Sequence, residues 1–189
     1  RNAEHVTNGP GPAVDRFGAA GGAIRFDGVT SAITIPDADW QKSVPLSVSF
    51  WIKTDSATAP TAMFLGKYLH ATGDGWLVFY EGGLLCAAHI SDNFLFYSRV
   101  NTLTTIDGRW HHVVVTITES QLVLYVDGAR VPSNHSKVSM MKVTTNEPIR
   151  IGRIRSTMWP DHAGLIGAMD DVAFYNRILT DEEILLLAQ

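Results

Sequence analysis

Three neighbouring segments of the sequence place aromatic and polar side chains at alternate positions, which is a pattern typical of a ligand-binding surface on a sheet. Residues two apart on a strand share a face. If the three segments pair consecutively, one open face carries Trp76, Tyr80, His89, Tyr97 and Arg99. Aromatic rings stack on the apolar faces of sugar rings, and Arg and His donate hydrogen bonds to hydroxyls or carboxylates. The set predicts a ligand site, although Tyr and Trp are also ordinary half-buried strand residues.

A polar loop that begins at Arg153 offers a second candidate site. It contains Arg155 and Trp159, and Trp159 is followed by Pro160. A Trp next to Pro in a polar loop is rarely a core residue, and loops carry function more often than strands do. We expect Arg155 and Trp159 to bind an anionic or neutral glycan at the edge of a sheet. The alternative is a loop that packs over the end of the fold.

The acidic residues do not form the pair that glycoside hydrolysis requires. A retaining hydrolase holds two carboxyl groups about 5–5.5 Å apart, a spacing that alternate residues of one strand supply. No acidic-x-acidic run occurs inside an apolar segment, and the sequence has neither a Gly-x-Ser-x-Gly elbow nor a His-Glu-x-x-His motif. We therefore expect no enzymatic activity.

Two adjacent histidines, His111 and His112, could suggest a zinc site. Adjacent residues on a strand point to opposite faces, so both cannot readily bind one metal ion. No Cys or third His lies nearby at a ligand spacing, whereas structural zinc sites use four ligands. The pattern favours a structural role for both histidines.

Length, charge and cysteine content narrow the class of protein. The 189 residues, 46% of them hydrophobic, suit one domain with a sizeable core. The net charge of −4 and the absence of a long basic block argue against a nucleic-acid partner. The single cysteine, Cys86, excludes an internal disulfide, and its apolar neighbours predict a buried thiol. No apolar run approaches the roughly 20 residues that span a bilayer, so we expect no membrane insertion.

The candidate residues lie on short strands that alternate with turn signals, which predicts a β-sandwich. The expected strands are residues 23–26, 32–35, 46–53, 63–66, 75–80, 84–90, 94–100, 111–118, 121–126, 149–151 and 165–175. The one expected helix begins after Thr180, where acidic residues precede an apolar run. Residues 1–22 are rich in Gly, Pro and Ala and read as an irregular arm on the domain or a linker. Because the chain starts with Arg1, we expect a domain excised from a longer protein.

Five motifs occur in a fixed order along the chain. They are DRFG with AIRFDG and ITIP (15–36), LSVSFWIK (46–53), WHHVV (110–114), LYVDG (124–128) and GAMDDVAFYNRILT (167–180). Together they resemble the laminin-G-like jelly-roll domains of the concanavalin A-like lectin/glucanase superfamily. The resemblance implies an all-β fold over residues 23–189, a two-sheet antiparallel jelly-roll sandwich with one short C-terminal helix.

The resemblance also implies a calcium site, because many members of the family bind Ca²⁺. Asp27 and Asp170 match family positions that lie near one another at one rim of the sandwich. A carboxylate that points inward from an apolar strand needs a partner, and a bound structural cation supplies one. The alternative is that a backbone amide or an Arg satisfies the carboxylate.

Most members of the family are not catalytic, so the sequence predicts a carbohydrate-binding (lectin-like) or adhesion module of a larger secreted or surface protein. The expected partner is a glycan or polysaccharide, and the expected location is extracellular or at the cell surface. The main alternative is a protein-interaction or structural domain with a protein partner and no glycan ligand. A divergent glycoside hydrolase or lyase is the least supported reading, since the carboxylate pair is missing.

Overall fold

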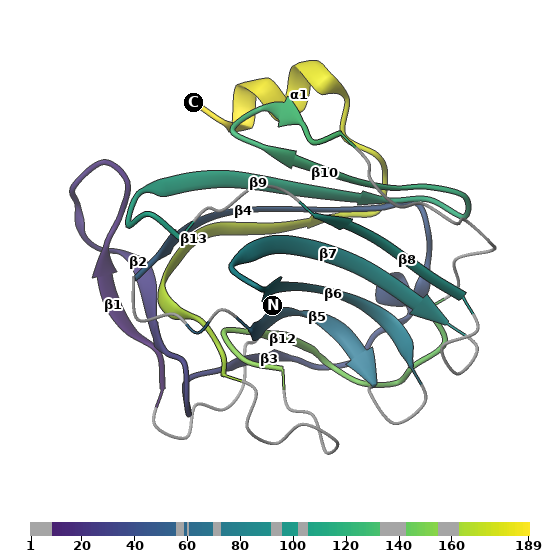
Figure 1. The fold of residues 1–189 in the computed structure, drawn as a ribbon, viewed down its shortest axis with the longest axis horizontal. Helices are drawn as coiled ribbons and strands as arrows, with labels where there is room; N and C mark the ends of the chain where they lie inside the picture. Colours follow the sequence, from purple (N-terminus) through teal and green to yellow (C-terminus); the bar gives the residue numbers. More distant parts are fainter. Residues whose placement is uncertain are drawn as a thin grey trace.

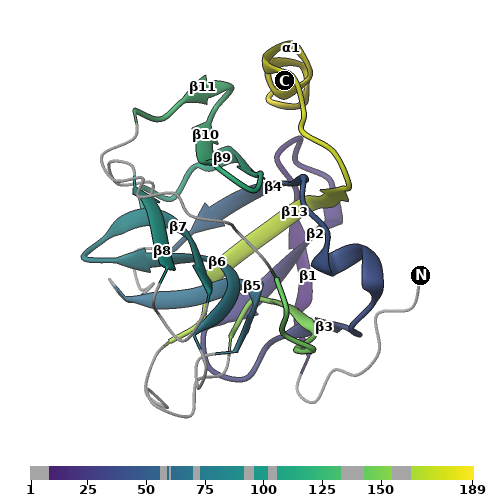
Figure 2. The same cartoon turned by 90° about the vertical axis from the view of Figure 1, so that its right-hand side faces the viewer.

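The computed structural model describes residues 9–55, 59, 61–69, 73–91, 96–101, 106–132, 143–154 and 163–189. Two antiparallel sheets lie one above the other as curved layers, and the C-terminal helix lies outside them (Figure 1). The view turned by 90° shows the same layering (Figure 2). The expected all-β sandwich with a single C-terminal helix is therefore confirmed.

The larger sheet has seven strands in the order β1-β2-β13-β4-β9-β10-β11. These strands are β1 (Gly11–Val14), β2 (Ala20–Asp27), β13 (Ile166–Tyr175), β4 (Leu46–Thr54), β9 (Trp110–Ile117), β10 (Leu122–Val126) and β11 (Ala129–Arg130). The last strand along the chain, β13, lies between β2 and β4, so the two ends of the domain meet in this sheet.

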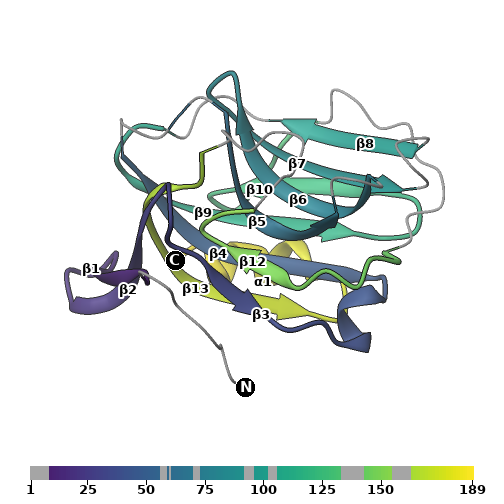
Figure 3. The same ribbon diagram turned by 90° about the horizontal axis from the view of Figure 1, so that it is seen from below.

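The smaller sheet has six strands in the order β3-β12-β5-β6-β7-β8. These strands are β3 (Ile33–Ile35), β12 (Ile149–Ile151), β5 (Ala62–Leu69), β6 (Asp74–Glu81), β7 (Leu84–Ser91) and β8 (Phe96–Asn101). A short 3₁₀ helix, η1 (Asp39–Lys42), joins β3 of this sheet to β4 of the other. Seen from below, the β1–β2 hairpin projects at one edge of the molecule (Figure 3).

The main core fills the space between the two sheets. On β4, Leu46, Val48, Phe50 and Ile52 are buried in this core, while the alternate residues such as Trp51 face away from it. This alternation matches the order of apolar and polar residues in the segment, since successive side chains of a strand point to opposite faces. The face of β4 that turns away from the core is therefore the outer face of the seven-stranded sheet.

The six-stranded sheet is apolar on both faces. Trp76, Val78 and Tyr80 of β6 belong to the main core, whereas Leu77 and Phe79 of the same strand belong to a second buried cluster on the other face. The second cluster also contains Cys86, whose thiol is fully buried as predicted. A strand that is apolar on both faces gives no alternation from which to tell the inner face.

Helix α1 (Asp181–Leu187) packs on the outer face of the seven-stranded sheet (Figure 1). It buries Ile184 against Val114 of β9 and Tyr125 of β10. Its start is fixed by a capping box in which Thr180 accepts from the backbone of Glu183 and the Glu183 side chain accepts from the backbone of Thr180. Within the part of the chain that the structure describes, no helix is long and apolar enough to cross a membrane.

The segment before residue 23 differs from the expected irregular arm. Residues 11–14 form β1, which pairs with β2 at the edge of the larger sheet, and β2 begins at Ala20. An edge strand tolerates Pro12 because one row of its backbone N–H groups needs no partner strand. Gly and Pro content alone therefore misled the prediction. Residues 1–8 lie outside the described residues.

Candidate functional site

Three residues of the first predicted surface lie inside the protein. Trp76 and His89 each expose 1% of their surface, and Tyr80 is fully buried. Trp76 and Tyr80 point into the main core, between the sheets. The prediction that Trp76, Tyr80 and His89 line an open surface is therefore wrong, because the face of β6 that carries the largest rings is the one that fills the sandwich.

The strand register also separates the remaining members of that set. His89 of β7 pairs with Trp76 on one side and with Ser98 of β8 on the other. Tyr97 and Arg99 pair instead with Ile90 and Ala88. They therefore occupy the alternate register positions, which belong to the opposite face of the sheet from His89. Of the second predicted site, Arg155 and Trp159 lie outside the described residues.

Asp27 organises the loop that follows β2. Its Oδ1 accepts hydrogen bonds from the backbone N–H groups of Val29, Thr30 and Ser31, and its Oδ2 accepts one from the Thr30 hydroxyl. Partial burial opposes the charge, but these hydrogen bonds outweigh it and hold the pKa of Asp27 well below its usual range. Oδ1 already accepts three hydrogen bonds, which leaves it poorly placed to bind a cation.

Asp170 is satisfied by protein groups too. Its Oδ2 accepts from Arg16 at 3.1 Å and its Oδ1 from the backbone N–H of Asp171 at 2.8 Å. Asp27 pairs with Ile166 across the sheet, so Asp170 lies four residues further on, roughly 13 Å along the strands. Among the described residues, no group of three His, Cys, Asp or Glu side chains could hold a metal ion. These two carboxylates do not fit a shared calcium site, and calcium binding by either alone stays a prediction.

A cleft of about 430 Å³ lies on the outer face of the seven-stranded sheet, beside α1. Its floor contains Ser49 and Trp51 of β4, His112 of β9 and Tyr175 of β13. Trp51 and Tyr175 are half-buried, so part of each ring is open to solvent. We call this region the outer cleft. Its volume and its mixture of aromatic and polar side chains are those of a small-molecule site.

Arg16, from the turn between β1 and β2, forms one side of the outer cleft. Its guanidinium lies 4.8 Å from the centroid of the Trp51 ring and 4.3 Å from that of Phe17. The same group donates to Asp170 at 3.1 Å and to Asp171 at 2.7 Å. The cation is thus stacked between two rings and held by two carboxylates, which fixes the position of the Trp51 indole.

Asp171 stands at a β-bulge where β13 shifts register against β4. Its φ of 47° places it in the left-handed region, which non-glycine residues rarely adopt. A bulge re-aims the side chain that it carries. The Asp171 side chain accordingly remains 63% exposed at the outer cleft although it binds Arg16.

His112 lies at the bottom of the outer cleft and is 1% exposed. Its Nε2 lies 2.9 Å from the Ser49 hydroxyl, and its ring lies 5.3 Å from that of Trp51. Its Nδ1 is buried without a hydrogen-bond partner among the described residues, as is Nε of Arg16. Burial lowers the pKa of His112 to about 4, so the imidazole is neutral at pH 7.

His111 faces the other way, as the strand geometry predicts. Its two ring nitrogens lie 2.8 Å from Asp127 and 3.1 Å from Asp107. Burial opposes its charge, but these two carboxylates outweigh it and raise the pKa of His111. Asp127 and Gly128 both have positive φ and form the two-residue turn between β10 and β11. The expected strands 111–118 and 121–126 are present as β9 and β10, which pair antiparallel.

Leu186 and Leu187 of α1, together with Gln189 just after the helix, supply the other side of the outer cleft. Leu186 is 66% exposed. Arg177 forms two hydrogen bonds of 2.7 Å to Glu183, and this contact lowers the pKa of Glu183 to about 2. The ion pair and the capping box together fix where α1 begins, and with it the position of this wall.

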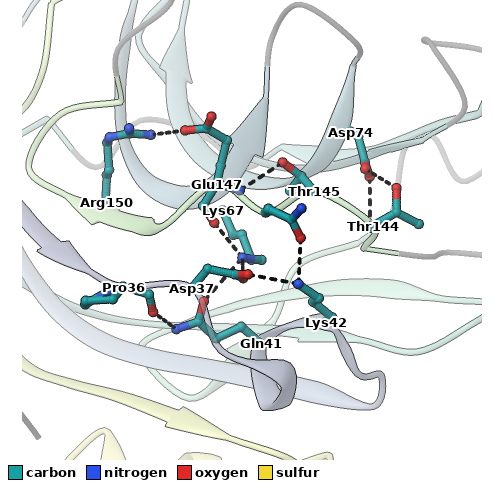
Figure 4. A network of polar contacts seen from close by, with 11 residues as sticks. Pro36, Asp37, Gln41, Lys42, Lys67, Asp74, Thr144, Thr145, Glu147 and Arg150 are labelled. Carbon is teal, nitrogen blue, oxygen red and sulfur yellow. Dashed lines mark hydrogen bonds and ion pairs between the residues drawn. The ribbon is translucent and has the colours of Figure 1, made fainter.

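A second polar cluster lies under η1 at the six-stranded sheet (Figure 4). The fully buried ammonium of Lys67 donates to Asp37, to Gln41 Oε1 and to the backbone carbonyl of Glu147. Lys42 also pairs with Asp37, at 2.9 Å. Hydrogen bonds from Lys42 and Lys67 lower the pKa of Asp37. We call this group the Lys67 cluster.

The outer cleft was not predicted from the sequence. Its residues come from the β1–β2 turn, β4, β9, β13 and α1, so no local spacing connects them. Two signals were present. Trp51 lies on the polar face of the alternating β4 segment, and the Asp170–Asp171 pair breaks an otherwise apolar strand. The residues that sequence reasoning placed in a site lie elsewhere or outside the described part of the chain.

Comparison with known proteins identifies the fold. The domain-4 structure of AbnA, a GH43 extracellular arabinanase from Geobacillus stearothermophilus in complex with arabinotriose, is 20% identical, with a TM-score of 0.72 over 95% of this chain and 81% of that one. Domains LG4-5 of the mouse laminin alpha1 chain are 18% identical, with a TM-score of 0.63 over 96% of this chain and 47% of that one.

The ligand-binding domain of botulinum neurotoxin serotype D, in complex with N-acetylneuraminic acid, is 14% identical, with a TM-score of 0.70 over 94% of this chain and 43% of that one. This chain thus spans less than half of the laminin and toxin chains. No curated protein matches the sequence significantly. The family model described as concanavalin A-like lectin/glucanases superfamily matches residues 27–185, and the chain therefore belongs to this laminin-G-like family.

Proposed function

We propose that the chain is a non-catalytic carbohydrate-binding module and that the outer cleft holds the glycan. The observation that carries the proposal is the composition of the cleft floor, where the part-exposed rings of Trp51 and Tyr175 flank polar side chains. Aromatic rings offer flat apolar surface to sugar rings, and the polar groups between them bind hydroxyls.

The spacing of the two rings suits a ligand of more than one sugar unit. Tyr175 pairs with Ser47 across β13 and β4, and Trp51 lies four residues further along β4. The two rings therefore stand roughly 13 Å apart along the strands. A ligand that contacts both must be extended, which favours an oligosaccharide or a polysaccharide chain over a single sugar.

The two carboxylates on Arg16, Asp171 at the outer cleft and Asp170 next to it in the chain, support a role in binding and not in hydrolysis. Asp170 and Asp171 bind the same guanidinium. A glycosidase instead sets its two carboxyl groups across the scissile bond, one of them as a proton donor. In this proposal the glycan is bound and released unchanged.

The names of the structural neighbours support the glycan and a location outside the cell. Their structures contain arabinotriose and N-acetylneuraminic acid, and the arabinanase is extracellular. We extend both properties to this chain as part of the proposal. A protein-binding or adhesion role without a glycan is the competing function.

Affinity electrophoresis and calorimetry against a panel of polysaccharides test the proposal. We expect binding to at least one polysaccharide, and we expect Trp51→Ala to weaken it about tenfold, because a buried aromatic contact is commonly a dominant one. Trp40→Ala is the matched control, since Trp40 is 41% exposed on η1 and does not line the outer cleft.

Three results would contradict parts of the proposal. Binding that survives Trp51→Ala but is lost in Trp159→Ala would move the site to the loop that the sequence predicts. Absence of binding across neutral and acidic polysaccharides would overturn the glycan proposal and favour a protein partner. Release of shorter sugars from any polysaccharide would overturn the non-catalytic assignment.

A further inference from the structure

The charges around the outer cleft bear on which glycans would bind there. This inference rests on the proposed function, in which the outer cleft holds a glycan. Arg16 is the one basic side chain among the residues that line the cleft. Its guanidinium already binds Asp170 and Asp171. Two carboxylates therefore face one guanidinium, and no positive charge is left over for an anionic ligand.

The second nitrogen-bearing side chain of the cleft does not change this balance. The His112 ring is buried at the floor and contacts the Ser49 hydroxyl through Nε2. Its burial keeps it neutral at pH 7. The outer cleft thus offers no unpaired positive charge, and the exposed charged group that it presents to a ligand is the carboxylate of Asp171.

The exposed hydrogen-bonding group of the cleft calls for a ligand that donates. The Asp171 carboxylate is 63% exposed and can only accept. A sugar hydroxyl can donate to it, whereas a carboxylate ligand cannot.

The backbone supports a specific role for Asp171. The β-bulge and the left-handed φ of 47° turn its side chain out to the cleft, in a conformation that Asp and Asn tolerate better than other non-glycine residues do. A bulge that displays a carboxylate among the aromatic residues of a cleft is a reason to look for a ligand that the carboxylate contacts.

We propose that the outer cleft selects neutral, hydroxyl-rich saccharides and excludes acidic ones, with Asp171 accepting hydrogen bonds from sugar hydroxyls and repelling sugar carboxylates. The specificity lies in one exposed carboxylate held beside an already neutralised arginine. Arg16 acts as a positioning residue that fixes Trp51 and Asp171, and it does not serve as an anion receptor.

The test uses matched pairs of polysaccharides. Each neutral polysaccharide that binds and carries a free primary hydroxyl is compared by calorimetry with the same polymer oxidised to the carboxylate at that carbon. We expect the wild-type chain to bind the neutral form at least about tenfold more tightly. Asp171→Asn keeps the side-chain shape and a residue that tolerates positive φ. This variant should bind the oxidised form about fivefold more tightly than the wild type does.

Asp39→Asn is the control, because Asp39 lies on η1 and does not line the outer cleft. It should leave both affinities unchanged. Equal or tighter binding of the oxidised form by the wild-type chain would overturn this inference while leaving the carbohydrate-binding proposal intact. An unchanged preference in Asp171→Asn would overturn the role given to Asp171. Failure to bind any neutral or oxidised polymer would overturn the proposed function itself.

Discussion

The Lys67 cluster and the outer cleft are both polar groups built into an apolar sandwich, but they differ in how their atoms are satisfied. The ammonium of Lys67 has three N–H donors, and Asp37, Gln41 and Glu147 each supply one acceptor for them. In the outer cleft, Nδ1 of His112 and Nε of Arg16 are buried without a partner among the described residues. We therefore call the Lys67 cluster closed, because the donors of its ammonium all have acceptors, and the outer cleft incomplete, because it contains buried polar atoms without a partner among the described residues.

The difference separates stability from binding. A buried charge costs free energy unless every donor is paired, so the complete Lys67 cluster is explained by folding alone. Unpartnered buried polar atoms lower stability and call for an explanation, such as a ligand or an ordered water. An incomplete polar region next to a cleft is therefore the better candidate for function than a larger, complete one.

Removal of the Lys67 side chain should have the largest effect on stability. We expect Lys67→Ala to lower the free energy of unfolding by about 3–5 kcal/mol, because it leaves a cavity and strips partners from Gln41 and Glu147. Lys67→Met retains most of the volume and should cost less. Urea denaturation measures both.

The glycan affinity of both Lys67 variants, measured where they are folded, should match that of the wild type, since Lys67 does not line the outer cleft. A loss of affinity in the folded Lys67→Met variant would break the distinction between the two regions. Equal destabilisation by Met and Ala would show that hydrogen bonds, and not packing, dominate the closed cluster.

The adjacent histidines should give opposite dependences of stability on pH. The folded pKa of His112, about 4, lies below the unfolded value of 6.5, so protonation favours the unfolded chain. Its contribution is complete above pH 6.5 and is lost as the pH falls. Between pH 7 and pH 5 the loss is about 2 kcal/mol. His112→Gln should remove this part of the slope.

His111 works in the opposite sense, because its folded pKa is raised. Its contribution is complete below the unfolded pKa and is lost as the pH rises through the folded pKa. His111→Gln should therefore steepen the loss of stability on acidification. Urea denaturation of both variants at pH 7 and pH 5 makes the comparison. If the slope of His112→Gln equals that of the wild type, the imidazole of the outer cleft is not held neutral by burial.

Sequence reasoning succeeded for elements whose pattern is local. The segment from Leu46 to Lys53 was expected as a strand and forms β4, and the helix expected after Thr180 is α1. Both signals act within a few residues, through strand geometry and backbone capping. Strand β1 was missed because pairing at an edge depends on its partner β2, which Gly and Pro content does not reveal.

The site could not be predicted because it depends on two features that no short stretch of sequence reveals. These are the face of β6 that turns inward and the contacts between residues far apart in the chain. The segment from Trp76 to Tyr80 is apolar at every position, so periodicity cannot tell which face turns to the other sheet. The outer cleft requires Arg16 to meet Asp171, 155 residues away. Such a contact follows from the position of β13 between β2 and β4, and that order is a property of the whole fold.

Weakening the cap of α1 should have the smallest effect on stability and still reach the outer cleft. We expect Thr180→Ala to cost about 1 kcal/mol, because the backbone N–H of Glu183 loses its acceptor. The first turn of α1 should fray and displace the wall formed by Leu186 and Leu187.

Glycan affinity should then fall by more than it does in Lys67→Met, although Lys67→Met is the less stable variant. Calorimetry and urea denaturation on the same two proteins test this reversal. If affinity instead follows stability, the cleft and the closed cluster behave as one cooperative unit, and the contrast between them has no functional meaning.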